Sequence, residues 1–197
     1  MWSSTIIIGR LKNYLSWSST ILTIFHTDCI IDLSNRGFPR NRRAPMTITF
    51  IGHSSISSSE KLKNIVKDLI RKNAFSHNKI ICYLGGRGDF DELCATACRE
   101  LKKERGDIEL IYVTPYISLS EQSKIRYNEE QGLYDSSIYP PIESTPPRFA
   151  ISKRNEWMIL NSDLVIAYVI RSYGGAYKSL QVAKKRNKRI INICSLI

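Results

Sequence analysis

Two glycine-containing stretches have the composition of anion-binding turns. They are Gly85-Gly86-Arg87-Gly88-Asp89 and Ser172-Tyr173-Gly174-Gly175-Ala176, and each is expected to join a strand to a helix. Glycine lets backbone amides approach an anion closely, and a helix N-terminus adds about half a positive charge. Two such turns at equivalent places predict a site for a phosphate, while plain strand–helix turns are the alternative. Neither stretch has the GKS or GKT ending of a P-loop or the GxGxxG pattern of dehydrogenases, so those two kinds of nucleotide site are not supported.

Side chains near these turns carry groups suited to such a site. Arg154 stands at the start of a predicted helix, and its planar guanidinium is suited to phosphate. A surface arginine without a ligand is the alternative, and Asn155 follows it directly. Gly52 and His53 end the first predicted strand, where His53 either contacts a ligand or caps a turn. Asp163 is expected to be a turn or capping residue rather than a catalytic acid.

Alternating strands and helices position these residues. Short apolar, β-branched runs predict strands, and apolar residues spaced by three and four predict helices. Strands are predicted at 47–51, 79–84, 108–113, 164–169 and 189–193, and helices at 89–105, about 149–160, about 174–186 and around the apolar positions from 62 to 70. Ser57–Ser59 is expected to cap the first helix, and Asp89 with Glu92 to form a capping box on the second. This order predicts an α/β fold whose parallel sheet of about five strands carries helices on both faces.

Ligands of such sheets bind beyond the carboxyl ends of the strands, where the strand order reverses. The glycine turns and His53 would all lie there. The segment 114–148 begins at the same edge and carries five prolines and four tyrosines. Connections of this length are commonly binding loops or lids. We therefore predict that 114–148 is a loop that closes over a ligand.

Composition limits the class of protein. The chain has 197 residues, of which 43% are hydrophobic, and a formal net charge of +11. These values are typical of a globular protein of one domain, and no apolar run is long enough to predict a membrane span. Residues 1–45 repeat Trp-Ser-Ser-Thr and lack a clear period, so we predict an N-terminal arm or upstream extension there, outside the fold. A signal peptide ending near Phe25 is the less favoured alternative. The folded domain is predicted at 46–197.

Cysteine and histidine usage bears on compartment and chemistry. The five cysteines form no CxxC pair and lie mostly in apolar or helical surroundings, which is typical of reduced thiols and predicts a cytoplasmic location. They are Cys29, Cys82, Cys94, Cys98 and Cys194. The three histidines, His26, His53 and His77, are far apart. We therefore expect no metal site, no histidine-based triad and no cofactor.

The densest basic run, Lys184-Lys185-Arg186-Asn187-Lys188-Arg189, has two interpretations. Together with the basic stretch 36–43, it is a candidate contact for nucleic acid. The alternative is a solvated helix C-terminus, where cations favour the helix dipole, and we prefer it. The run also lacks the interleaved aromatic residues that stack on single-stranded bases.

Residues 46–194 resemble the SLOG superfamily, which are Rossmann-like proteins grouped with the DNA-processing protein A family and the LOG phosphoribohydrolases. They are most similar to small bacterial YpsA-like members. The segments that carry the resemblance are Thr47–His53, Tyr83–Asp91, Arg148–Met158, Ser162–Ala176 and Ala183–Lys185. The resemblance implies a nucleotide or nucleotide-derived ligand at the sheet edge, a sensor role and self-association. The loop 114–148 would then cover the base or ribose.

The LOG enzymes, which cleave the N-glycosidic bond of nucleoside 5'-monophosphates, offer a sharper comparison. Arg154 and Met158 match the Arg and Met of their helix, while Asn155 replaces the adjacent Lys. Their catalytic glutamate would fall at Ser179, and no carboxylate follows before the basic run. Because a positioned carboxylate assists glycosidic cleavage, phosphoribohydrolase activity is an alternative rather than the first prediction. A nucleic-acid-binding module is the other alternative.

Overall fold

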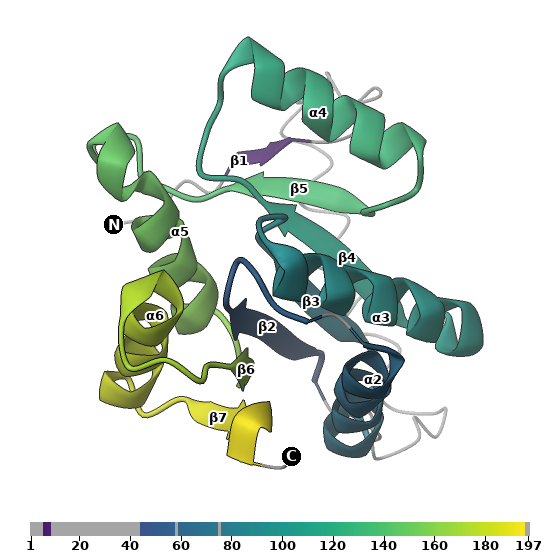
Figure 1. Cartoon of the computed structure of the whole chain (residues 1–197). Helices are drawn as coiled ribbons and strands as arrows, with labels where there is room; N and C mark the ends of the chain where they lie inside the picture. The colour runs from purple at the N-terminus through teal and green to yellow at the C-terminus, as the bar shows by residue number, and fades with distance from the viewer. Residues whose placement is uncertain (1–5, 9–43, 58, 75, 196–197) are drawn as a thin grey trace, which may run out of the picture.

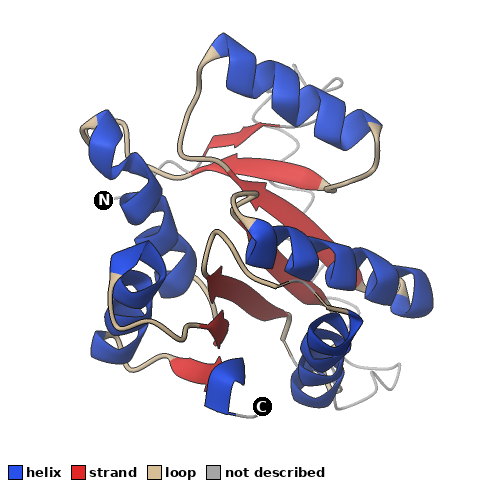
Figure 2. Ribbon diagram, viewed as in Figure 1, coloured by secondary structure: helices blue, strands red, loops and turns tan. Residues whose placement is uncertain are grey.

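The computed structural model describes residues 6–8, 44–57, 59–74 and 76–195 (Figure 1). Within them, one sheet has the order β1(Ile6–Ile8), β5(Ser136–Tyr139), β4(Ile108–Val113), β3(Ile80–Leu84), β2(Met46–Gly52), β6(Leu164–Tyr168) and β7(Arg189–Asn192). The helices are α2(Glu60–Ala74), α3(Asp89–Arg105), α4(Leu119–Glu130), α5(Pro147–Leu160) and α6(Gly174–Lys185), followed by a 3-10 turn, η1(Ile193–Ser195). All neighbouring strands are parallel except β1, which is antiparallel to β5. Helices flank both faces of the sheet, as Figure 2 shows, and the predicted α/β architecture is confirmed with six parallel strands instead of about five.

The strand order reverses beside β2. The chain runs outward from β2 through β3 and β4 to β5, and α2, α3 and α4 share the core on one face of the sheet. It then returns through α5 to β6, which pairs with the other side of β2. Helices α5 and α6 pack on the opposite face. The carboxyl ends of β2 and β6 are therefore the topological switch point, where open sheets of this kind hold ligands.

The central strands are covered by helices on both faces, which explains why their apolar runs are nearly continuous. On β3, Cys82 and Leu84 face the core beneath α2 and α3, whereas Tyr83 packs toward Trp157 of α5. Successive side chains of a strand point to opposite faces, so a strand covered on both sides needs apolar residues at nearly every position. This pattern made these strands predictable.

The segment 114–148 differs from the predicted loop, because it contains α4 and β5. Ser118 caps α4 by accepting the Glu121 amide at 3.3 Å. The buried positions of α4 are Glu121, Ile125 and Asn128, so two of the three are polar and no apolar stripe marks the helix. The strand β5 has only four residues, two of them serine. Neither element has the apolar period on which the prediction depended.

Residues 1–45 are described only in part. Ile6–Ile8 form β1 and extend the sheet beyond β5, which places three residues of the predicted arm at the sheet edge. The remaining positions up to 43, including Cys29, His26, the basic stretch 36–43 and the signal-peptide alternative, lie outside the described residues. The boundary at residue 45 stays a prediction. None of the described helices is long and apolar enough to cross a membrane.

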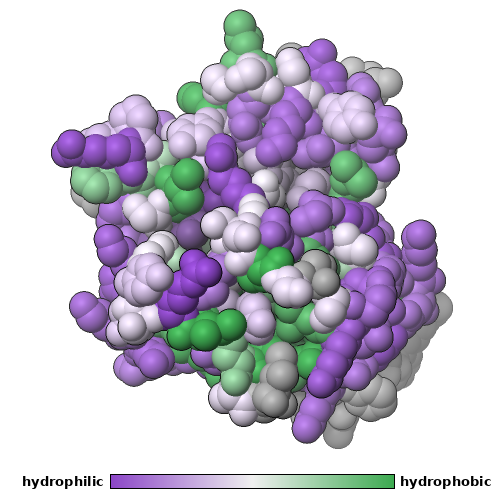
Figure 3. Space-filling view, in the orientation of Figure 1, coloured by the Kyte–Doolittle hydropathy of each residue, from purple (hydrophilic) through white to green (hydrophobic). Residues whose placement is uncertain are grey.

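Helices α2 and α3 lie side by side, and charged side chains on their outer surface pair with each other. Ser59 accepts the Leu62 amide at 3.1 Å, which confirms the predicted cap of α2. Glu100 of α3 accepts from Lys63 and Lys67 of α2 at 2.6 and 2.9 Å. Figure 3 shows this side of the molecule as largely hydrophilic. These half-buried pairs link two helices whose apolar faces meet beneath them.

Candidate functional site

A cleft of about 500 Å³ opens at the switch point, between the end of β2, the loop after β6, the first turns of α3 and α6, and one side of α5 beyond its first turn. Most of the predicted site residues line it, namely Gly52, His53, Gly85, Arg87, Gly88, Arg154, Asn155, Gly174 and Gly175. Gly86, Asp89 and Ser172 are not among the lining residues. The sequence analysis did not single out several that are, including Ser54, Asp91, Ile151 and Arg171. The fold thus brings the two glycine turns to one cleft.

Arg154 is buried and not on the surface. Its side chain is 2% exposed, and its Nη1 donates to the carbonyl oxygens of Gly85 and Val113, both at 2.7 Å. It therefore ties α5 to the ends of β3 and β4. Among the described residues, no acceptor lies within hydrogen-bond distance of its Nε. Burial lowers the pKa of Arg154, and the nearby Asp91 carboxylate opposes this shift.

The approach of Arg154 depends on glycine at position 85. A Cβ built on Gly85 would fall 2.3 Å from Arg154 Nη1. This distance is far below a van der Waals contact, so any larger residue would displace the guanidinium. The glycine at 85 is accordingly explained by a contact within the protein.

One amide of the first glycine turn is engaged by the carboxylate of Asp91. Asp91 Oδ2 accepts the Arg87 amide at 3.0 Å, and the nearby amides of Gly85 and Gly86 also favour the charged form of this carboxylate. Burial raises the pKa of Asp91, while these amides and Arg154 act in the opposite direction. The Arg87 amide is therefore not free for an external anion, and the phosphate cradle expected at the first turn stays a prediction. Asp91 is the third residue of α3, where an acid commonly faces the helix's own amides, so its position alone did not mark it as a site residue.

The start of α3 also differs from the predicted capping box. Gly88 is the N-cap, with φ at 89°, and no side chain caps the helix. Asp89 accepts the Ile56 amide at 3.1 Å, and Glu92 binds Arg99 at 2.8 Å. Asp89 thus fastens the segment after β2 to α3. The positive φ of Gly88 prevents the ordinary capping geometry that a Ser or Asp would adopt there.

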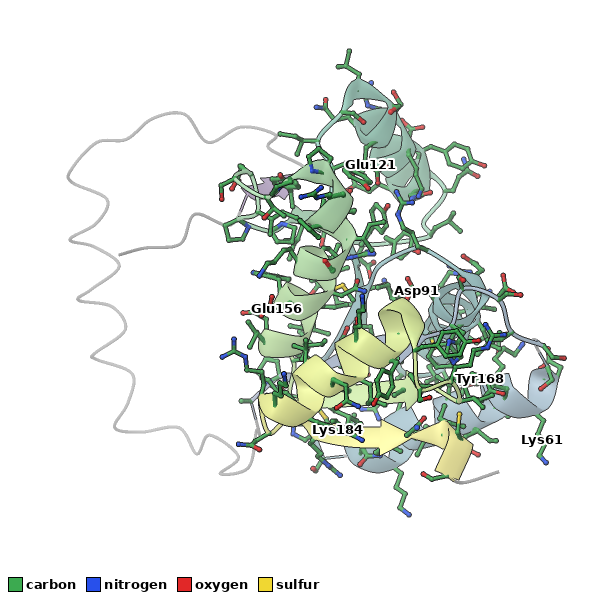
Figure 4. All side chains as sticks on the ribbon, turned by 60° about the vertical axis from the view of Figure 1, so that its left-hand side comes forward. Lys61, Asp91, Glu121, Glu156, Tyr168 and Lys184 are labelled. Carbon is green, nitrogen blue, oxygen red and sulfur yellow. The ribbon has the colours of Figure 1, made fainter. Side chains whose placement is uncertain are left out.

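The second glycine turn provides the open cradle. Tyr173 is the N-cap of α6, no side chain caps this helix, and Gly174, Gly175 and Ala176 of its first turn line the cleft. A Cβ added to Gly174 or Gly175 would have no atom within 4 Å, so the protein leaves open space beside this turn. In Figure 4, Asp91 lies near this end of α6. The uncapped first turn of a helix binds anions through its amides and dipole.

The charges of the cleft favour an anion. Its charged lining side chains are Arg87, Arg154 and Arg171, against Asp91 alone. Arg87 and Arg171 are exposed, and Arg171 adjoins the second glycine turn. Since Asp91 is already bonded to the first turn, the excess positive charge faces the open side of the cleft.

His53 holds the loop that follows β6. Its Nε2 accepts the amides of Ile170 and Arg171 at 3.1 and 3.3 Å. Burial, aided by the charge of Arg171, lowers the pKa of His53. The ring is thus neutral at neutral pH, with its proton on Nδ1. His53 both caps this loop and lines the cleft, so the two alternatives for it are compatible.

The positions singled out by the LOG comparison also meet here. Ser179 lines the cleft and accepts from Asn155 Nδ2 at 3.4 Å, and Met158 lines the same wall. Asp163 accepts the Thr47 amide at 2.8 Å, so it fastens the start of β6 to β2, and it is not among the residues that line the cleft. In the part of the chain that the structure describes, no three His, Cys, Asp or Glu side chains gather as a metal site.

The fold and the cleft define a Rossmann-like α/β protein with an open cleft at the switch point. The chain matches no protein-family model and no curated protein. It is similar to DNA processing protein A of Helicobacter pylori, described for its single-stranded DNA binding mode, at 20% identity over 74% of this chain and 64% of that one, with a TM-score of 0.51. It is also similar to DNA processing protein A of Streptococcus pneumoniae, at 16% identity over 74% of this chain and 49% of that one, with a TM-score of 0.52. The chain thus spans less than two thirds of either, and at these identities the likeness shows a shared fold alone.

Proposed function

We propose that this protein binds a nucleotide or nucleotide-derived ligand, whose phosphate lies on the first-turn amides of α6 and faces Arg171. The observation that carries this proposal is the uncapped N-terminus of α6 opening into a cleft with three arginines and one carboxylate. Phosphate pairs well with guanidinium groups and with helix N-termini. Ile151 and Met158 supply an apolar wall for the sugar or base. A sensor role, implied by the resemblance, is the biological use we propose for such binding.

Isothermal titration with inorganic phosphate, AMP, ADP-ribose and NAD tests the proposal. At least one of the nucleotides should bind at micromolar concentration, and Arg171→Ala should weaken binding about tenfold, as expected for one charge-assisted contact. Lys184→Ala, which removes an exposed cation outside the cleft lining, is the matched control and should leave binding unchanged. Absence of binding by all four compounds would refute the proposal.

A second candidate is the phosphoribohydrolase, because the structure supplies a carboxylate that the motif comparison lacked. Asp91 lines the same cleft as Arg154 and Met158, on the wall formed by the first turn of α3. A carboxylate whose pKa is raised is suited to proton transfer near neutral pH. Incubation with AMP should then release adenine, and Asp91→Asn should stop the release while AMP still binds. If no base is released from any nucleoside monophosphate, this candidate is removed.

The nucleic-acid alternative loses part of its basic surface to internal contacts. Lys188 donates to the carbonyl oxygens of Leu160 and Ser162 at 2.7 and 2.9 Å, Arg189 binds Asn73, and Arg186 lies 3.6 Å from Glu156. Only part of the run is therefore free to meet a polyanion. A gel-shift assay with single-stranded DNA should show steep salt dependence if this alternative holds. Self-association and a cytoplasmic location remain further proposals, which size-exclusion chromatography and cell fractionation would test.

A further inference from the structure

A second hollow adjoins the cleft at the same edge of the sheet. Its volume is about 360 Å³, and it lies between the segment after β4, the end of β5 and the start of α5. Tyr116, Tyr139, Ile142 and Ala150 supply its apolar wall, and three of them form one buried cluster with Tyr116 packed against it. Glu143 is the one charged residue among its described lining residues. Without a cation, this hollow is unsuited to phosphate but suited to an uncharged aromatic ring.

The linings of the two hollows meet at a ridge formed by Arg87 and Tyr116. Ile151 lines the cleft and the preceding residue, Ala150, lines the side hollow. Arg87 lines the cleft, and its guanidinium carbon lies 5.3 Å from the centroid of the Tyr116 ring. Arg87 is exposed and Tyr116 half-buried, so this ridge is at the surface. A ligand can cross it with a phosphate beside Arg87 and a ring beside Tyr116.

A chain of hydrogen bonds that begins at the buried Glu121 holds the backbone of Tyr116 in place. The carboxylate of Glu121 accepts the hydroxyls of Tyr112 and Thr114 at 2.5 and 2.9 Å, and Thr114 Oγ1 accepts the Tyr116 amide at 3.2 Å. Glu121 is 8% exposed, and Figure 4 shows it on the α4 side of the molecule. The side hollow is thus preformed, which limits the ordering cost of binding.

We infer that the ligand is a dinucleotide in which a diphosphate joins two nucleosides, with one base in the side hollow. This inference rests on the proposed function. The cleft alone falls in the volume range that holds a whole small ligand, so a mononucleotide leaves the side hollow empty. A bridging diphosphate carries two negative charges, which match the excess of the three arginines over Asp91 in the cleft.

Titration with two probes that differ by one base tests the inference. Diadenosine diphosphate and ADP-ribose share the diphosphate and both riboses, and only the former has a second adenine. Diadenosine diphosphate should bind about tenfold tighter, the scale expected for stacking of one base. Tyr116→Ala should reduce its affinity to that of ADP-ribose and leave ADP-ribose unchanged, while Tyr116→Phe should keep the advantage. Tyr127→Ala, an exposed tyrosine of α4 outside the hollow, is the control.

A second variant tests the inference independently, in case Tyr116→Ala does not fold. Ala150→Leu fills the hollow while keeping Tyr116, and it should remove the same tenfold advantage. Equal affinity of the two probes for the native protein, or an equal loss for both probes in Tyr116→Ala, would overturn the inference. If neither probe nor AMP binds at all, the proposed function itself fails, so the two failures are distinguishable.

Discussion

Arg154 Nη1 donates to the carbonyl oxygen of Gly85 at 2.7 Å, and the two residues stand 69 positions apart in the chain. This bond crosses from α5 to the end of β3 and forms part of the floor of the cleft. The same nitrogen bonds Val113 at the end of β4. The geometry of the cleft therefore depends on one buried guanidinium, whose approach requires a glycine at 85.

Gly85→Ala should lower the free energy of unfolding by about 1–3 kcal/mol, because displacing Arg154 leaves buried carbonyl groups without donors. Urea denaturation followed by circular dichroism measures this. Gly175→Ala is the matched control in the second glycine turn, since its Cβ would meet no atom within 4 Å. It should leave stability unchanged within about 0.5 kcal/mol. Equal effects of the two substitutions would contradict the role assigned to Arg154.

Asp91→Asn should alter how stability depends on pH. Burial raises the pKa of Asp91 above its ordinary value of 3.8. Between that value and the raised one, the folded state binds more protons than the unfolded state, so this carboxyl's contribution to the free energy of unfolding falls as pH rises. The variant should lack this fall when urea denaturation is compared from about pH 4 to about pH 8.

The control for Asp91 is Glu92→Gln, which removes the same charge from the neighbouring exposed position. The free energy of unfolding of this control should depend on pH in the same way as that of the native protein. A stability advantage of the native protein over Asp91→Asn that grows with rising pH would show the opposite sign and reject the assignment.

Glu100→Gln should make the stability of the protein less sensitive to acid. The contribution of Glu100 changes with pH in the direction opposite to that of Asp91. Hydrogen bonds from Lys63 and then Lys67 lower the pKa of Glu100 below its ordinary value of 4.5. Its contribution to stability is therefore present above that value and is lost as pH falls through the lowered pKa. Thermal unfolding at several pH values and salt concentrations measures this, with Glu130→Gln on exposed α4 as control. Because ion pairs near the surface are weak and screened by salt, the effect should be smaller than that of Gly85→Ala. A larger effect would contradict this ranking.

The described thiols should react in a fixed order with iodoacetamide in the native protein. Cys194 is partly exposed, whereas Cys82, Cys94 and Cys98 are buried. Burial raises the pKa of Cys94 well above its usual range, and the thiol contact with Cys82, 3.6 Å away, raises that of Cys98. Since the thiolate is the reactive form, peptide mapping should find Cys194 labelled first. Early labelling of Cys98 would mean that α3 separates from β3 in the native state.

The sequence by itself determined the elements that have a strong local pattern. The apolar runs of β3 and β6 and the spacing in α2 and α3 predicted the sheet and its cover, and the two glycine turns predicted which edge holds the cleft. The helix α4 has one local signal, the Ser118-x-x-Glu121 spacing of a capping box, but its buried face is polar. Its identity was therefore hidden from hydrophobic periodicity.

Only the tertiary structure decided what each site residue contacts. Whether Arg154 faces solvent or Gly85, and whether the first turn binds an external anion or Asp91, depends on packing between α3, α5 and the strand ends. The side hollow beside Tyr116 likewise arises only where residues 115–118 fold back against residues 139–150. Local propensity follows from neighbouring residues and is readable along the chain. Burial, hydrogen-bond partners and cavities depend on residues brought together by folding, and one sequence alone does not encode those contacts in any local pattern.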